Sequence, residues 1–225
     1  MSKLDRIIFE PLNVKEGKNV SVPEISEGIK ISFSVVDGFA LDKEDQKTVE
    51  AIMEELLANG YSYVFQVVGG NIPVSRNLHI ELTPQNRFRH QGVLMKVPTE
   101  RMLELIGKPD SKKKELEQSQ VIHELIHNLD DAEAFPMFIE MIYMLDRGQK
   151  WRIEEIQTLY KKDDKLGSAY QKGLEQISEW LGYSGIEDLL SQIVVRPVAE
   201  LKEIFKAKLI AYCENDEVLS KQMKK

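Results

Sequence analysis

Two histidines and a glutamate in one short segment are the residues best placed to do chemistry. The segment reads His123-Glu124-Leu125-Ile126-His127, and it holds two of the four histidines in the 225-residue chain. On a helix, residues i and i+4 lie one turn apart on the same face, so both imidazoles can bind one metal ion. Zinc accepts histidine nitrogens at about 2.0–2.1 Å, and the spacing therefore predicts a zinc site.

Glu124 is expected to play a different part from its neighbours. It lies roughly 100° around the helix from His123, so it should miss the metal. It can still reach a water on the metal, whose pKa the metal lowers. A glutamate in that position can take the proton of the water as it attacks a carbonyl carbon. We therefore expect Glu124 to be the general base of a metal-assisted hydrolysis.

A catalytic zinc site needs a third protein ligand and one open position. Glu133, six residues after His127, is the first candidate, and Glu140 is the alternative. The spacing of Asp130 and Glu133 is also that of a capping box, in which Glu133 would cap the next helix. Asp130 and Asp131 are weaker candidates, because they are expected to end the first helix, where aspartate tolerates a left-handed backbone. The pattern favours Glu133 and leaves Glu140 open.

The motif needs a helix, and its flanks supply one. Ile122, Leu125, Ile126 and Leu129 follow the i, i+3, i+4, i+7 pattern of an apolar helix face, which predicts a helix over 112–129. The histidines project from the edge of that apolar stripe, where a helix that lines a cleft would place ligands. Pro136 fits in the first turn of the next helix if that helix begins near residue 134.

The chain divides into two halves of different pattern. Residues 1–110 read as a small mixed α/β unit, and residues 111–225 read as all-helical, which predicts an α+β fold with a cleft between two subdomains. In the first half, the predicted elements are strands at 29–36, 63–68, 78–82 and 92–97, and a helix at 43–59 that Asp42 caps and Gly60 ends. From residue 99 onward, the predicted elements are helices at 99–106, 112–129, 132–145, 150–161, 168–181, 186–193 and 198–214.

The composition and the net charge of the chain indicate where the protein is located and which classes of partner it does not bind. The formal net charge is −7, and an acidic chain is a poor match for nucleic acid, which requires a basic face. No apolar run approaches the roughly 18 residues of a membrane span, and no secretory signal is visible. The single cysteine, Cys213, cannot form an internal disulfide. We expect a cytoplasmic protein that binds neither nucleic acid nor membrane.

The chain resembles the zincin metallopeptidases. His123-Glu124-Leu125-Ile126-His127 is the motif of that clan in full, and Ala132-Glu133-Ala134-Phe135 resembles the glutamate-bearing helix of gluzincins, including the lethal-factor-like group. Zincins also have an upper α/β subdomain and a lower helical one. Gluzincins usually place the glutamate much further from the second histidine. Six residues is the metzincin spacing, but Asp130 stands where metzincins have glycine, and Glu133 replaces their third histidine.

The resemblance implies a zinc-dependent metallohydrolase that cleaves peptide bonds of a peptide or protein substrate, with His123, His127 and Glu133 as ligands. It implies that a strand along the cleft pairs with the substrate, for which 92–97 is the candidate, although the same strand could lie inside the sheet. Two alternatives stay open. The chain could be a catalytically silent zincin-like binding protein, or a helical interaction protein in which the motif arose by chance.

Several other residues could contribute to such a site. Zincins often use a tyrosine or histidine to stabilise the developing oxyanion, and Tyr143, Tyr160 and Tyr170 are available in the helical half. Sequence spacing does not choose among them. His79 and His90 are isolated in the sequence, and a lone histidine is weak evidence for a metal site, so neither is expected to bind metal.

Overall fold

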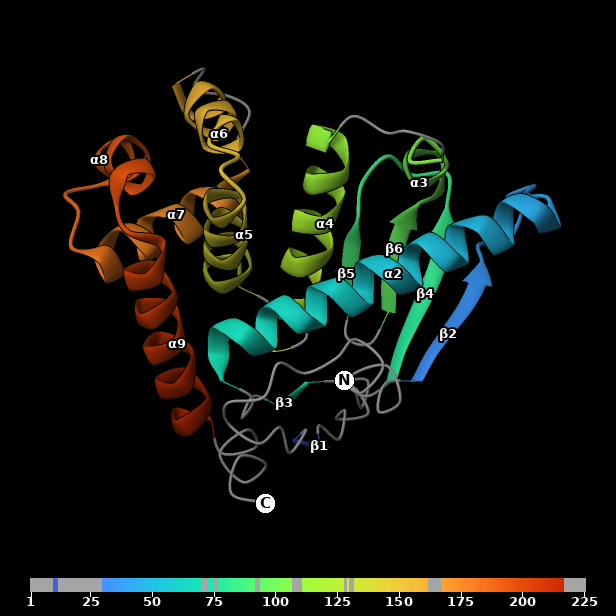
Figure 1. Cartoon of the computed structure of the whole chain (residues 1–225), viewed down its shortest axis with the longest axis horizontal. Helices are drawn as coiled ribbons and strands as arrows, with labels where there is room; N and C mark the ends of the chain where they lie inside the picture. The colour runs from blue at the N-terminus through green and yellow to red at the C-terminus, as the bar shows by residue number, and fades with distance from the viewer. Residues whose placement is uncertain are drawn as a thin grey trace.

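The computed structural model describes residues 10–11, 30–69, 73–74, 77–91, 94–106, 111–127, 129, 132–161 and 167–216 of the chain. Within these residues the protein is a mostly helical α+β structure, and the predicted fold class is confirmed at this level. A four-stranded sheet lies at one end of the molecule and most of the helices gather at the other (Figure 1). None of the described helices has both the length and the apolar character needed to cross a membrane.

The four-stranded sheet has the order β2-β4-β6-β5. Three strands run parallel, and β5 is an antiparallel strand at the edge. The strands are β2 (Lys30–Val35), β4 (Asn77–Thr83), β5 (Arg89–Gln91) and β6 (Leu94–Pro98). A separate antiparallel pair joins β1 (Glu10–Pro11) to β3 (Pro73–Val74).

The two faces of the sheet differ as the pleat of a strand requires. Along β4, Leu78, Ile80 and Leu82 are buried, whereas His79 and Glu81 between them are half-buried. Side chains alternate between faces at every residue, so one face meets the core and the other is polar. On the polar face both ring nitrogens of His79 are hydrogen-bonded, at 2.8 Å each, to the hydroxyls of Ser32 and Ser34. His79 is therefore a structural residue of the sheet.

The longest helix, α2 (Lys43–Val68), crosses the apolar face of the sheet (Figure 1). It begins where expected, because the Asp42 carboxylate accepts hydrogen bonds from the Glu44 and Asp45 N–H groups. Its end was predicted wrongly. The expected stop at Gly60 and the expected strand at 63–68 are both absent, and the helix continues to Gly69, which caps it with φ of 79°.

Gly60 has a packing role that its sequence context does not reveal. It lies inside α2, where that helix crosses α4 (Ser111–Ile126). A Cβ at this position would lie 3.0 Å from Leu125 Cδ1 and 3.5 Å from Ile122 Cγ1. The glycine therefore lets the two helices approach closely, and it brings the helix that carries the motif against the core of the α/β half.

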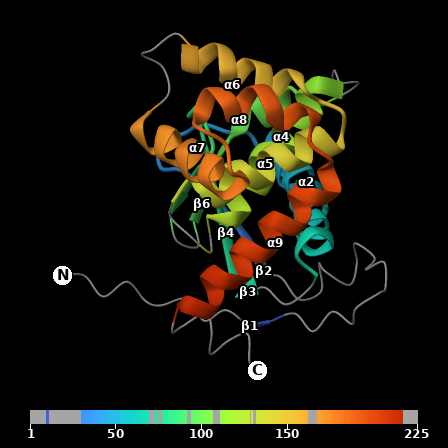
Figure 2. The same ribbon diagram turned by 90° about the vertical axis from the view of Figure 1, so that its left-hand side faces the viewer.

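The short helix α3 (Thr99–Leu103) packs against α2. In the helical part of the molecule, α5 (Ala134–Asp146) is central, and its residues from Ala134 to Leu145 are all buried. The other helices of this part are α6 (Trp151–Lys161), α7 (Ser168–Leu181), α8 (Ile186–Gln192), a 3-10 turn (Ile193–Val195) and α9 (Val198–Asn215). Figure 2 shows α7, α8 and α9 on the side of the molecule away from the sheet. A single apolar cluster runs through the sheet, α2 and this helical set.

Candidate metal centre

The two motif histidines lie at the end of α4 with their rings turned toward one another. The helix ends at Ile126, three residues earlier than expected, and His127 lies in the turn that follows. The Nε2 atoms of His123 and His127 are nevertheless 3.2 Å apart, as one helical turn between the two residues allows. His123 is buried and His127 is half-buried, so one side of the pair is open.

Glu133 completes the cluster from the start of α5. Its Oε2 atom lies 3.3 Å from His123 Nε2 and 3.7 Å from His127 Nε2. Glu133 occupies the N-cap position of α5, but its side chain makes no capping hydrogen bond. Pro136 falls in the first turn of this helix, where its missing N–H has no intrahelical partner to lose. The carboxylate is thus turned to the imidazoles rather than to its own helix.

The three donor atoms are spaced as a tetrahedral metal ion would require. With ligand distances of about 2.0–2.1 Å, two ligands of tetrahedral zinc lie about 3.3–3.4 Å apart. The separations among His123 Nε2, His127 Nε2 and Glu133 Oε2 are 3.2, 3.3 and 3.7 Å. Imidazole and carboxylate donors suit zinc and other first-row divalent metals. These three residues form a group that could hold a metal ion.

The charges around the cluster favour a cation at its centre. Although burial disfavours the charged ring, the carboxylates of Glu133 and Glu140 raise the pKa of His123 to about 10. Although burial also opposes ionisation of Glu133, the neighbouring imidazoles lower its pKa to about 2. Glu133 Oε2 is buried and has no hydrogen-bond partner among the described residues. The carboxylates that favour a proton on the His123 ring would equally favour a metal cation between the two imidazoles.

Glu124 lies next to the cluster without belonging to it. Its side chain is buried, with 7% of the residue exposed, and its Oε2 atom has no hydrogen-bond partner among the described residues. Burial raises the pKa of the Glu124 carboxyl, and the neighbouring His123 and His127 oppose that effect. A buried carboxylate oxygen that no protein group satisfies is costly, and it is available to a water in the site.

Glu140, the alternative third ligand, contacts the other side of His123. Its Oε2 atom lies 3.0 Å from Nδ1 of His123, the ring nitrogen that faces away from His127 and Glu133. The structure therefore brings Glu133, and not Glu140, to the Nε2 atoms that the two histidines turn toward one another. Asp130 and Asp131, the two weaker candidates, lie outside the described residues.

Two further rings border the cluster. The ring of Tyr170, from α7, stacks on that of His123 with centroids 6.2 Å apart and planes 15° from parallel. The ring of His90, from β5, lies 6.4 Å from that of His127. His90 pairs with Met95 of β6, so it projects from the apolar face of the sheet toward the helices. Although His90 is isolated in the sequence, the fold places this polar residue on an otherwise apolar face of the sheet, next to His127.

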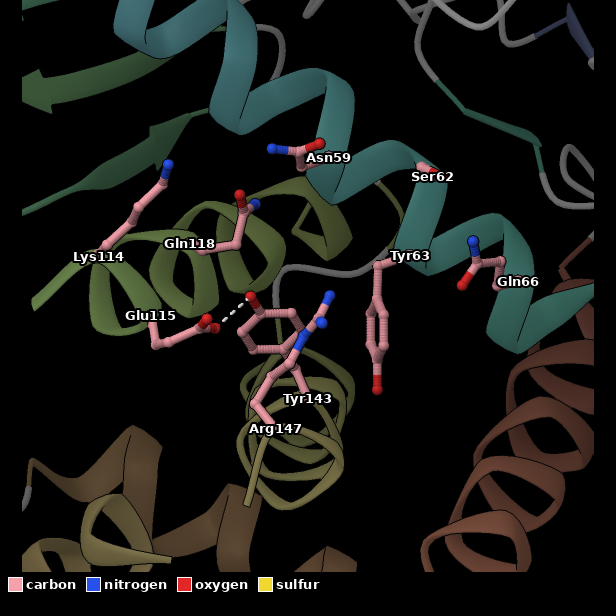
Figure 3. A pocket seen from close by; sticks show the side chains of 9 residues that line it. All are labelled: Asn59, Ser62, Tyr63, Gln66, Lys114, Glu115, Gln118, Tyr143 and Arg147. Carbon is pink, nitrogen blue, oxygen red and sulfur yellow. Dashed lines mark hydrogen bonds between the residues drawn. The ribbon is translucent and has the colours of Figure 1, made fainter. Parts of the chain in front are cut away.

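Tyr143 does not share this site. It lines a polar cavity of about 260 Å³ between α2, α4 and α5, where its hydroxyl donates a 2.6 Å hydrogen bond to Glu115 Oε2 (Figure 3). Residues of the metal cluster are not among those that line the cavity, which are Asn59, Ser62, Tyr63, Gln66, Lys114, Glu115, Gln118, Tyr143 and Arg147. Tyr160 packs against the apolar core from α6. Of the three tyrosines considered, Tyr170 is the one in contact with a motif histidine.

The two alternatives for the strand at 92–97 differ in where it lies in the sheet. The candidate at 92–97 corresponds to β6, which lies between β4 and β5 inside the sheet. The edge strand is β5, which carries His90, and no other strand in the described part of the chain pairs with its outer side. Because β6 is paired on both sides, the alternative in which 92–97 lies inside the sheet is the one that the structure confirms.

Comparison of the chain with protein-family models, with curated proteins and with solved structures gives no match. The resemblance to zincins therefore depends on the motif residues themselves.

Proposed function

We propose that this protein is a zinc-dependent metallohydrolase, and specifically a metallopeptidase of zincin type. His123, His127 and Glu133 would hold the zinc ion, and Glu124 would act as general base. The observation that carries the proposal is the convergence of three donor atoms at 3.2–3.7 Å, beside a buried oxygen of Glu124 that has no hydrogen-bond partner among the residues that the structure describes. A structural zinc site is normally closed by four protein ligands, whereas three ligands leave a position for a reactant.

The chemistry divides between the ion and the side chains. When bound, zinc lowers the pKa of a water and polarises the carbonyl oxygen of the scissile bond. Glu124 accepts the proton of the attacking water and returns it to the amine that leaves. Burial of Glu124 raises its pKa, and a base whose pKa lies nearer to neutrality is better matched to both transfers.

Tyr170 is the group best placed to stabilise the oxygen that gains charge. Burial, together with the nearby carboxylates of Glu140 and Glu133, raises the pKa of the Tyr170 hydroxyl, so it stays protonated at neutral pH. A protonated hydroxyl can donate a hydrogen bond to a developing oxyanion. Its ring is fixed in place against His123.

The edge of β5 would bind an extended substrate. An unpaired strand edge can accept a peptide as a further strand, with affinity from main-chain hydrogen bonds. β5 presents such an edge among the described residues, and His90 of this strand lies beside His127. A peptide paired there would pass close to the metal cluster.

The test compares metal content with turnover in one variant. Glu124→Gln should bind about one zinc per chain, as the parent does, because Glu124 is not a ligand. It should lose most cleavage of an unbiased peptide library followed by mass spectrometry, because an amide cannot accept the proton. Glu115→Gln, another glutamate on α4 but in the polar cavity, serves as the matched control and should keep both properties.

Other outcomes identify the alternatives. A parent protein that binds zinc but cleaves no peptide in the library would be a silent binding protein. A parent that takes up no zinc would leave a helical protein with an accidental motif. Unchanged cleavage by zinc-loaded Glu124→Gln would refute the role of Glu124.

A further inference from the structure

Glu140 is a buried carboxylate with a complete set of partners. It lies in the middle of α5, and only 3% of the residue is exposed. Its Oε1 atom accepts hydrogen bonds from Gln120 Nε2 at 2.9 Å and from Arg152 Nε at 3.1 Å. Its Oε2 atom lies 3.0 Å from His123 Nδ1. Three helices, α4, α5 and α6, therefore meet at this one carboxylate.

The two oxygens of Glu140 have different partners, and this arrangement determines which nitrogen of the His123 ring carries a hydrogen. Oε1 is ion-paired with Arg152 at 3.1 Å and Oε2 faces the His123 ring, an arrangement that favours an ionised carboxylate. An ionised carboxylate only accepts hydrogen bonds, so Nδ1 of His123 must carry the hydrogen between them. A neutral ring with hydrogen on Nδ1 has its lone pair on Nε2, which is the nitrogen that faces His127 and Glu133.

Arg152 makes it possible to keep this carboxylate in the core. Its side chain is mostly buried and lies between Glu140 and Glu155, to whose Oε2 atom its Nη1 atom donates a 2.7 Å hydrogen bond. A buried carboxylate without a counter-ion would be expected to take up a proton. The ion pair with Arg152 therefore leaves Oε2 of Glu140 as an acceptor that faces His123 Nδ1.

We propose that Glu140, held by Arg152 and Gln120, is a positioning residue that fixes the tautomer and orientation of the His123 ring for metal binding. Glu140 does not itself bind the metal. This inference rests on the metal centre proposed above. Carboxylates that hold a ligand histidine from its far nitrogen typically change metal affinity 10–100-fold when they are removed.

The test measures zinc affinity by chelator competition together with the His123 Nδ1–H signal in ¹⁵N-labelled, zinc-loaded protein. Glu140→Gln should weaken zinc binding about tenfold. Its Nδ1–H signal should shift or be lost through exchange with water. Arg152→Met, which removes the counter-ion but keeps an unbranched side chain, should weaken zinc binding in the same direction. The effects of the two changes should not add, because both act through one carboxylate.

Glu117→Gln is the matched control. Like Glu140, Glu117 is a buried carboxylate paired with an arginine; it lies on α4, and its partner is Arg101 at 2.6 Å. Its substitution should lower the free energy of unfolding and leave zinc affinity and the His123 signal unchanged. This control therefore separates a loss of zinc affinity caused by the missing Glu140 carboxylate from one caused by a general loss of stability.

The zinc affinities of the Glu140→Gln and Arg152→Met variants separate the positioning role from its alternatives. Parent-like zinc affinity in Glu140→Gln would overturn the positioning role while leaving the metal centre intact. A loss as complete as that of His127→Ala would also overturn it, because Glu140 would then be a ligand. If Glu140→Gln does not fold, Arg152→Met decides, and parent-like affinity in that variant refutes the inference. If the parent protein binds no zinc, the metal centre fails and the positioning role fails with it.

Discussion

Gly173 offers a way to disturb the metal centre from a helix that contributes no ligand. It lies in α7, directly against the start of α5. A Cβ at this position would lie 3.0 Å from Glu133 Cβ, 3.0 Å from Met137 Sδ and 3.1 Å from the backbone carbonyl carbon of Glu133. The methionine side chain can move aside, but the backbone of Glu133 cannot. Since ordinary contacts begin at 3.4 Å, Gly173→Ala requires a shift of about 0.4 Å between α7 and Glu133.

Two opposing effects determine the change in stability. Overpacking a well-packed core costs about 1–3 kcal/mol. Alanine is favoured over glycine inside a helix by about 1 kcal/mol, which offsets part of that cost. The free energy of unfolding should therefore fall by about 0–2 kcal/mol. Zinc affinity should fall by about tenfold, the lower end of the effect of disturbing the groups that position a metal ligand.

The assay is denaturant unfolding of the metal-free protein, together with chelator competition for zinc. Gly167→Ala is the control, because Gly167 is the N-cap of the same helix, a Cβ there would meet nothing within 4 Å, and its φ is −58°. The control should keep the zinc affinity of the parent. A Gly173→Ala protein with parent-like zinc affinity would refute the argument that α7 positions Glu133.

Other expectations follow from the same contacts. Glu133→Ala should weaken zinc binding far more than Glu140→Ala in chelator competition, and the reverse order would make Glu140 the ligand. Tyr170→Phe should keep zinc and lower peptide turnover by about 100-fold, the usual effect of losing an oxyanion donor, and unchanged turnover would exclude that role. Cys213, which is fully buried and whose pKa burial raises to about 12, should react with iodoacetamide only on unfolding, as mass spectrometry can follow. Hydrogen bonds from the Asp45 and Glu44 N–H groups lower the pKa of Asp42 below 3.8, so its capping effect is complete above that value and is lost as pH falls through the lower, folded-state pKa. Asp42→Ala should therefore destabilise the protein at neutral pH and have little effect in strong acid, as denaturant unfolding at both pH values can show.

The motif could be read from the sequence because its geometry is local. One helical turn separates His123 from His127, and that fixes the distance between their rings wherever the helix lies. The apolar stripe that includes Ile122 and Leu125 predicted the helix itself. Glu133 was only favoured over Glu140, because the choice depends on the turn between α4 and α5, where sequence spacing gives no direction. The side chain of Glu140 faces Nδ1 rather than Nε2 as a result of how α5 packs on α4.

The residues that sequence reasoning missed are those placed by tertiary packing. Arg152 reaches Glu140 from a different helix, and nothing in its local pattern distinguishes it from an exposed arginine. His90 reaches His127 because β5 turns back as an antiparallel edge strand. Gly60 was read as a helix stop by local preference, but close packing of α2 on α4 decided the outcome. In each case a contact between distant segments outweighed the local signal.

Charge balance connects these features into one argument about the metal. Three buried or half-buried carboxylates, Glu124, Glu133 and Glu140, surround the two motif imidazoles, and Arg152 is the arginine that pairs with one of them. Taken as ionised, with neutral imidazoles, this group has a formal charge of −2, which a divalent cation would balance. Among the described residues, His123 is the ring that contacts two of these carboxylates, and the oxygens Glu124 Oε2 and Glu133 Oε2 are buried without a hydrogen-bond partner. Uncompensated buried charge is costly, so this concentration of carboxylates supports the proposal that a cation binds between the two imidazoles.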